Sequence, residues 1–458
     1  MSSLLKRLLR RRLLVAAAVA LLVLAGGGLA AFALLRGNTG NVSHPNASFQ
    51  PEAPSKPPAR SARDRFVWPT YGYTPERRHY FPAPASFGPP FTERWSRAGR
   101  TLIEFPPAIS GRTLYVLNNF GLMQAINADT GRRRWHRKLG LVSASSPAVG
   151  GNTVYATILQ HHKAGAGRVV AVSARNGHIR WSRPLRGRSE SSPLLDHGSL
   201  YFGSENGTVY ALRARNGSTR WTFKASGAVK GGPALSNGVL YFGDYGGKVH
   251  AVRASNGHTV WTAKTKGAHF GFSAGQFYSS PAVAFGRVYL GNTDGRVYSF
   301  TVHNGQLAWA RQTGNYVYAS PAVAQISSYG PTVYEGSYDG TFYALDARSG
   351  RVRWKRRTGG KISGSATIVG DVVYFANLAR RSTLGLSVRT GRQVFSYSQG
   401  GFNPVVTDGH AIYLIGYSTI AALTPKSAKP PRAGAATRRH KHKHRRHKRH
   451  KRHHQRHR

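Results

Sequence analysis

The fold is decided by the stretch Ala344-Leu345-Asp346-Ala347-Arg348-Ser349-Gly350-Arg351-Val352-Arg353-Trp354, because its pattern returns along the middle of the chain. In each copy a short turn ends in glycine, and an aromatic side chain follows four residues later. Seven copies recur with a period of about 40–48 residues. The pairs are Gly131 and Trp135, Gly177 and Trp181, Gly217 and Trp221, Gly257 and Trp261, Gly305 and Trp309, Gly350 and Trp354, and Gly391 and Phe395.

Each repeat contains signals for four short strands. An apolar strand follows a Ser/Gly-Pro-Ala start, and an alternating segment such as 200–207 leads into an Asn-Gly, Gly-Gly or Asp-Gly turn. Such pairs supply the positive φ angles that tight hairpins need. Four strands in about 40 residues are typical of a β-propeller blade, in which the aromatic residue seals one blade against the next.

The strand count predicts how the ring closes. Blades one to seven run from about residue 103 to residue 398, and residues 402–423 add three strands without an aromatic fourth strand. The segment around Trp95 has the character of an aromatic fourth strand, but no three strands precede it to complete a blade. We therefore expect an all-β, eight-bladed propeller closed by an N-terminal strand. The predicted docking side chains are Trp95, Trp135, Trp181, Trp221, Trp261, Trp309, Trp354 and Phe395.

The N-terminal residues predict membrane attachment. Residues 13–35 contain no charge and would span about 34 Å as a helix, enough to cross a bilayer core. The basic residues 1–12 would stay in the cytoplasm, which makes the protein single-pass with its propeller on the extracytoplasmic side. The alternative is a cleaved signal peptide ending near Ala31-Phe32-Ala33, although 23 apolar residues are long for one.

The remaining segments differ sharply in composition. Residues 36–66 form a Pro-rich linker, residues 67–425 the propeller, and residues 426–458 a His/Arg/Lys-rich tail that we expect to be disordered. The net charge is +50, so both the propeller and the tail should attract anionic lipid or polymer. Whether the tail binds wall polymer, lipid or metal stays open, and no specific nucleic acid is predicted.

The repeat resembles the tryptophan-docking motif of pyrroloquinoline quinone (PQQ) repeat proteins. Residues 68–72 (Trp-Pro-Thr-Tyr-Gly), residues 78–80 (Arg-His-Tyr) and Trp95 are similar to the entry segment of quinoprotein dehydrogenases. The resemblance covers residues 67–425 and implies the propeller fold. It leaves activity open, because the family includes enzymes that use PQQ over calcium and scaffolds such as the propeller lipoprotein of outer-membrane assembly.

The residues needed for catalysis are sparse. The chain lacks cysteine, whereas the resemblance implies an adjacent cysteine pair in the enzymes, and calcium needs converging carboxylates. Four acids are expected in turns: Asp129, Asp294, Asp339 and Asp346. The others near strand ends are spread over four blades: Glu190, Glu205, Asp244 and Glu335. We therefore predict no enzyme activity, no catalytic residue, no cofactor and no metal.

Two departures from the repeat predict a binding face. Long connections at residues 267–280 and 314–320 join the outermost strand of one blade to the innermost strand of the next, so both lie on one face. Their aromatics would form a cation-rimmed surface or, alternatively, pack locally within longer loops. The candidate residues are Phe270, Phe272, Phe277, Tyr278, Tyr316 and Tyr318.

These observations predict a non-catalytic protein-binding or assembly scaffold anchored in the bacterial cell membrane. Its partner is expected to be an envelope protein. A PQQ-dependent oxidoreductase and a binder of anionic envelope glycans are the alternatives.

Overall fold

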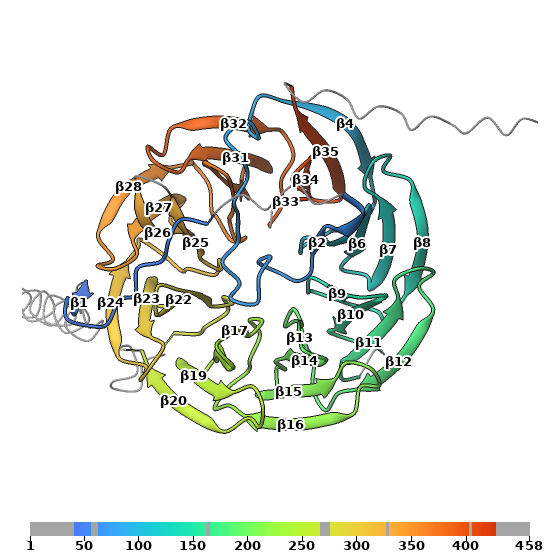
Figure 1. Cartoon of the computed structure of the whole chain (residues 1–458), viewed down its shortest axis with the longest axis horizontal. Coiled ribbons are helices and arrows are strands. Elements are labelled where there is room, and N and C mark those ends of the chain that lie inside the picture. Colours follow the sequence, from blue (N-terminus) through green and yellow to red (C-terminus); the bar gives the residue numbers. More distant parts are fainter. Residues whose placement is uncertain are drawn as a thin grey trace, which may run out of the picture. The chain divides into compact units, whose positions relative to one another are not determined.

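The computed structural model describes residues 41–55, 63–161, 165–265, 275–326, 329–402 and 405–426. Eight antiparallel blades surround a common centre in chain order (Figure 1). The first four blades are β5 (Ala108–Ser110), β6 (Thr113–Leu117), β7 (Leu122–Asn127) and β8 (Arg133–Lys138); β9 (Ala148–Gly150), β10 (Thr153–Ile158), β11 (Arg168–Ser173) and β12 (Ile179–Pro184); β13 (Leu194–Asp196), β14 (Ser199–Phe202), β15 (Thr208–Arg213) and β16 (Thr219–Lys224); and β17 (Ala234–Ser236), β18 (Val239–Gly243), β19 (Lys248–Arg253) and β20 (Thr259–Lys264).

The other four blades repeat this order from the innermost to the outermost strand. They are β21 (Ala282–Ala284), β22 (Arg287–Gly291), β23 (Arg296–Thr301) and β24 (Leu307–Gln312); β25 (Ala322–Ile326), β26 (Gly330–Gly336), β27 (Thr341–Asp346) and β28 (Val352–Arg357); β29 (Thr367–Val369), β30 (Val372–Asn377), β31 (Ser382–Ser387) and β32 (Gln393–Tyr397); and β33 (Val405–Thr407), β34 (Ile412–Ile415), β35 (Thr419–Pro425) and β4 (Phe91–Ala98).

Blade eight joins the two ends of the propeller. Strand β4 pairs antiparallel with β35, and Trp95 lies opposite Ala422. This confirms the predicted closure by an N-terminal strand. The pairing leaves neither end of the ring with an open sheet edge, where unpaired backbone groups would otherwise remain.

The repeated glycine and tryptophan meet between neighbouring blades. A Cβ on Gly131 would lie 2.6 Å from the ring of Trp95 in the preceding blade, and the other turn glycines face the preceding tryptophan in the same way. The indole N–H of Trp95 also donates to the carbonyl of Ala128, at 3.0 Å. Glycine is therefore required both by its positive φ and by the ring that packs on it.

Phe395 differs from the tryptophans for a structural reason. It lies on the outermost strand of blade seven and faces blade eight, where it packs edge-on against Phe91. In blade eight the third and fourth strands come from opposite ends of the chain, so no glycine turn joins them. An indole N–H would thus lack the turn carbonyl that it bonds elsewhere, and phenylalanine suffices.

The residues before β4 also pack on the ring. Strand β1 (Val42–Ser43) pairs with the outer edge of β24, and Ala47 is buried. The short helix η1 (Arg63–Arg65) places Arg63 beside Asp408 at 2.7 Å. Residues 41–52 of the predicted linker therefore contact the propeller.

The predicted membrane segment, residues 13–35, lies outside the described residues, as do residues 1–12 and 427–458. Within the described ranges, no helix has the length and apolar character needed to cross a bilayer.

Candidate functional site

Residues 68–81, called the channel segment below, cross the centre of the ring along its innermost strands (Figure 1). Five carbonyl oxygens of this segment accept backbone N–H groups from five blades. Each bond is given with its donor first: Val149 to Pro69, Leu235 to Pro75, Val283 to Glu76, Val323 to Arg78, and Ile368 to His79, at 2.7–2.9 Å. Strands β2 (Val67–Trp68) and β3 (Tyr80–Phe81) add pairings with β5 and β29. The channel segment thus ties most of the blades together.

Serine hydroxyls link neighbouring blades beside this segment. Each of these serines precedes an innermost strand, and its hydroxyl accepts a backbone N–H from the blade before it. The bonds run from Ser146 to Ser192, from Gly232 to Ser280, from Ser280 to Ser320 and from Ser320 to Ser365, at 2.6–2.9 Å. The Ser-Pro starts of the repeat therefore serve to join blades.

Blade four has glycine where its neighbours have serine, and Arg77 explains the difference. The Arg77 guanidinium donates to the carbonyls of Pro233, Tyr71 and Ser192, at 2.7–2.8 Å. A Cβ on Gly232 would lie 2.7 Å from that guanidinium. Burial lowers the pKa of Arg77 to about 9, so the group stays charged at neutral pH.

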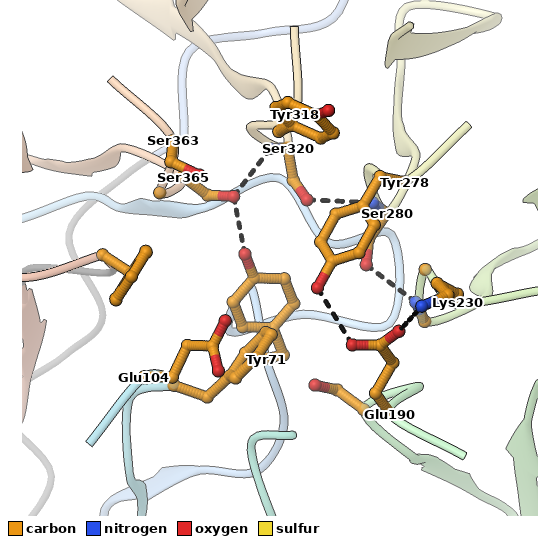
Figure 2. Close-up of a pocket in the computed structure, with 16 residues that line it drawn as sticks. Tyr71, Glu104, Glu190, Lys230, Tyr278, Ser280, Tyr318, Ser320, Ser363 and Ser365 are labelled. Atoms are coloured by element: carbon orange, nitrogen blue, oxygen red, sulfur yellow. Dashed lines mark hydrogen bonds and ion pairs between the residues drawn. The ribbon is translucent and has the colours of Figure 1, made fainter. Parts of the chain in front are cut away.

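Tyr71 forms the floor of a small cavity at the centre of the ring (Figure 2). Its hydroxyl donates to the Ser365 hydroxyl at 2.6 Å, and burial raises the pKa of this phenol. The cavity measures about 40 Å³, which is room for only a few water molecules. Its other charged or aromatic lining residues are Glu104, Phe105, Glu190, Lys230, Tyr278, Tyr318 and Phe402.

A lysine on the wall of this cavity lies between two glutamates. The Lys230 ammonium contacts Glu190, and the Tyr278 hydroxyl donates to Glu190 at 3.0 Å (Figure 2). Glu205, which does not line the cavity, lies 3.0 Å from the same ammonium. Burial alone would lower the pKa of Lys230, but the two carboxylates outweigh it and raise that pKa. Lys230 is therefore held as a cation whose charge is balanced by its neighbours.

Three predicted binding residues come together beside this cavity. The rings of Tyr278 and Tyr318 are 5.7 Å apart, and those of Tyr316 and Tyr318 are 5.8 Å apart. Tyr338 joins them at 4.8 Å from Tyr318, and Lys361 lies over its ring. We call Tyr278, Tyr316, Tyr318 and Tyr338 the tyrosine cluster. Tyr316 is about half exposed, so the cluster reaches the surface.

The predicted phenylalanines are placed differently. Phe277 is fully buried and packs edge-on against Tyr298, so it belongs to the core between blades four and five. Phe270 and Phe272 lie outside the described residues.

The sequence did not predict that Tyr71, Lys230 and Tyr338 would lie at the cavity and the tyrosine cluster. In the sequence Tyr71 stands out only as part of an entry motif, and it reaches the cavity because the channel segment crosses the ring. The signal for Tyr338 is its place before the Asp-Gly turn at residues 339–340, on the same face as the long connections. Lys230 carries no local signal.

The acids named from the sequence have separate roles. Asp294 and Asp339 accept N–H groups two residues later in their turns, as expected. Asp244 is buried; burial would raise its pKa, but hydrogen bonds from His250 and Ser226 lower it to about 2. Glu335 is fully buried on β26 and lies apart from these groups in its own blade.

Residues 92–262 and 205–429 match the family model described as outer membrane protein assembly factor BamB. The chain belongs to this family of PQQ-repeat propellers. No curated protein matches the sequence.

Several solved structures share the fold at low sequence identity. BamB from Moraxella catarrhalis is 16% identical, with a TM-score of 0.61 over 74% of this chain and 99% of that one. Quinohemoprotein alcohol dehydrogenase from Comamonas testosteroni is 13% identical, with a TM-score of 0.63 over 81% and 82%. The computationally designed protein Ika8 is 13% identical, with a TM-score of 0.60 over 73% and 99%. These similarities establish the fold.

The quinone and calcium of the enzymatic PQQ-repeat proteins do not fit these residues. Glu190 lines the cavity, but one of its carboxylate oxygens contacts Lys230 and the other accepts the Tyr278 hydroxyl. Among the described residues, no three His, Cys, Asp or Glu side chains gather as a metal site. The cavity of about 40 Å³ is also far smaller than the few hundred Å³ of an ordinary small-molecule site.

Proposed function

We propose that the protein is a membrane-anchored, extracytoplasmic scaffold that binds a protein partner and carries out no catalysis. The observation that carries this proposal is the tyrosine cluster beside a nearly filled channel. Tyrosine offers a large, rigid contact surface with a polar end, and it is enriched where proteins bind proteins. The neighbouring Lys230 and Lys361 contribute cation–π contacts with the same rings.

The proposed partner site is the half-exposed Tyr316 together with Tyr318 and Tyr338. These rings come from connections on one face, between β24 and β25 and between β26 and β27. The hairpin turns between third and fourth strands lie on the opposite face and offer a matched control. Asn256, between β19 and β20, is exposed there.

The test is photo-cross-linking in intact cells of the source organism with a photoreactive residue at position 316 or 256. We expect a discrete cross-linked protein from position 316 and none from position 256. Tyr338→Ala should reduce the yield at position 316, because it removes a ring that packs against Tyr318. Equal products from both positions, or none from position 316, would contradict the proposed site.

Location and catalysis need separate measurements. A reporter active only in the cytoplasm, fused after Arg458, should be silent if the propeller is extracytoplasmic. Purified protein supplied with PQQ and calcium should not oxidise alcohols or sugars. Dye-linked oxidation that disappears in Glu190→Gln would establish the oxidoreductase alternative instead.

A further inference from the structure

An arginine occupies the same bulge on the outermost strand of four successive blades. In each of these blades the docking tryptophan pairs with an alanine, and the next pairing skips the residue before the tryptophan. The skipped residue is the extra residue of a β-bulge, a feature that turns a side chain away from the regular sheet. In blades eight, one, two and three it is Arg94, Arg134, Arg180 and Arg220, called the arginine stripe below.

The stripe has clear ends. The same bulge position holds Val260 in blade four, Ala308 in blade five and Val394 in blade seven. In blade six it holds Arg353, but that side chain is paired with Asp346 at 2.6 Å. The run of arginines therefore covers one continuous arc of the rim.

Most of the stripe lacks neutralising partners. Asp346 ends β27, whereas the equivalent strand ends in blades one, two and three are Asn127, Ser173 and Arg213. Arg134, Arg180 and Arg220 are exposed, and no carboxylate among the described residues pairs with them. Only Arg94 approaches an acid, Asp129, at 3.9 Å.

A second row of arginines adds positive charge along the same arc. Arg137 and Arg183, two residues after their tryptophans, donate to the carbonyls of Gly177 and Gly217 in the next blade, at 3.1 and 2.9 Å. These bonds fix guanidinium groups at the junctions between blades. Glu93 is the one acid on the eight outermost strands, all of which the structure describes.

We propose that the arginine stripe binds a linear phosphate polymer along the rim of blades eight to three. A guanidinium presents a planar fork that matches phosphate oxygens, and repeated charges at equal height suit a repeating anion. The rim curves around the ring, so a flexible chain can contact all four blades where a flat membrane would touch fewer. The tryptophan rings beside the stripe pack on the turn glycines of the next blade, so these rings are not stacking platforms for nucleic-acid bases.

The first test is arginine footprinting of the full chain with phenylglyoxal, with long-chain inorganic polyphosphate as the probe. Peptide mass spectrometry should show protection of Arg134, Arg180 and Arg220. Arg356 and Arg357, exposed on β28 outside the stripe, should be protected much less. Equal protection at both places would mean attraction by net charge alone and would overturn the proposal.

The second test compares variants with the same loss of charge. Arg134→Gln/Arg180→Gln/Arg220→Gln should weaken polyphosphate binding by about tenfold or more and reduce the salt slope by roughly 2–3. Lys355→Gln/Arg356→Gln/Arg357→Gln should change affinity by less than about threefold. Stronger protection of the stripe by phosphatidylglycerol vesicles or by single-stranded DNA, at equal phosphate, would assign it to a membrane or to nucleic acid and refute the polymer.

Discussion

Glu335 occupies a position that neighbouring blades fill with apolar side chains. It directly precedes the glycine that ends β26, as Leu290 and Phe242 do in β22 and β18. Burial raises the pKa of Glu335 well above its usual range, and one carboxyl oxygen has no hydrogen-bond partner among the described residues. Burial in the fold therefore favours the neutral form of this group over its ionised form.

This predicts a stability that falls as pH rises. Below the usual pKa of glutamate, both the folded and unfolded chains hold the proton. Above it, the unfolded chain ionises while the folded chain stays protonated, so the unfolded state gains stability. Glu335→Leu should raise the free energy of unfolding by about 1–3 kcal/mol near pH 7 and by less near pH 4, as measured by urea denaturation. A larger gain at pH 4 than at pH 7 would show that the carboxyl is ionised in the fold.

Gly232 is closely surrounded by atoms that leave no room for a side chain. An added Cβ would lie 2.6 Å from the Ser192 carbonyl and 2.7 Å from Arg77, both held in place. Gly232→Ala should cost about 1–3 kcal/mol of unfolding free energy. Gly88→Ala is the control, because a Cβ at that residue would meet no atom within 4 Å, and it should change stability by less than about 0.5 kcal/mol. A similar loss of unfolding free energy in both variants would show that close packing around Arg77 is not the cause.

Strand β4 and the channel segment are the elements that hold the ring closed. A chain beginning at residue 99 lacks both, leaving the edge of β35 unpaired. We expect it to aggregate or to lose cooperative unfolding. A chain beginning at residue 41 keeps every described contact and should unfold as the full chain does. The measurements are thermal unfolding and size-exclusion chromatography, and a monomeric, cooperative product from residue 99 would contradict the closure.

Repetition determines which elements could be predicted from the sequence. The turn glycine appears seven times because blades one to seven each accept the tryptophan ring of the blade before them. The blades and their closure were therefore predictable. Tyr278, Tyr316 and Tyr318 were predictable as a group because connection topology assigns them to one face. Phe277, one residue earlier, turns into the core, and the sequence alone does not reveal that alternation within a loop. Lys230 lies in the connection between β16 and β17, and it reaches this site through ion pairs with Glu190 in the preceding connection and Glu205 in the preceding blade.

At the scale of the whole molecule, the arginine stripe and the basic tail should respond differently to pH. Arginine as a residue type carries its charge throughout the ordinary pH range. Residues 438–458 contain eight histidines, whose charge rises as pH falls toward about 6.5. Binding measurements can therefore separate the two.

Removing residues 427–458 should weaken binding to an anionic polymer and abolish its increase from pH 8 to pH 5.5. The footprint on Arg134, Arg180 and Arg220 should persist, and the thermal unfolding of the propeller should not change. Binding by both chains should fade with salt, because each contact with phosphate releases counterions. Should the truncated chain keep the full pH dependence, histidines in the propeller are responsible and the tail interpretation is wrong.

The pairing of β4 with β35 also determines when blade eight can form during synthesis of the chain. Trp95 emerges early in synthesis, yet its strand partner around Ala422 is made only near the end. The channel segment likewise waits for Ile368 in blade seven. Contacts so distant in sequence close slowly, so the first strand stays without its partner while most of the protein is still being produced. During that interval the unpaired edge of the sheet is exposed, and the chain is most prone to aggregation before the ring closes.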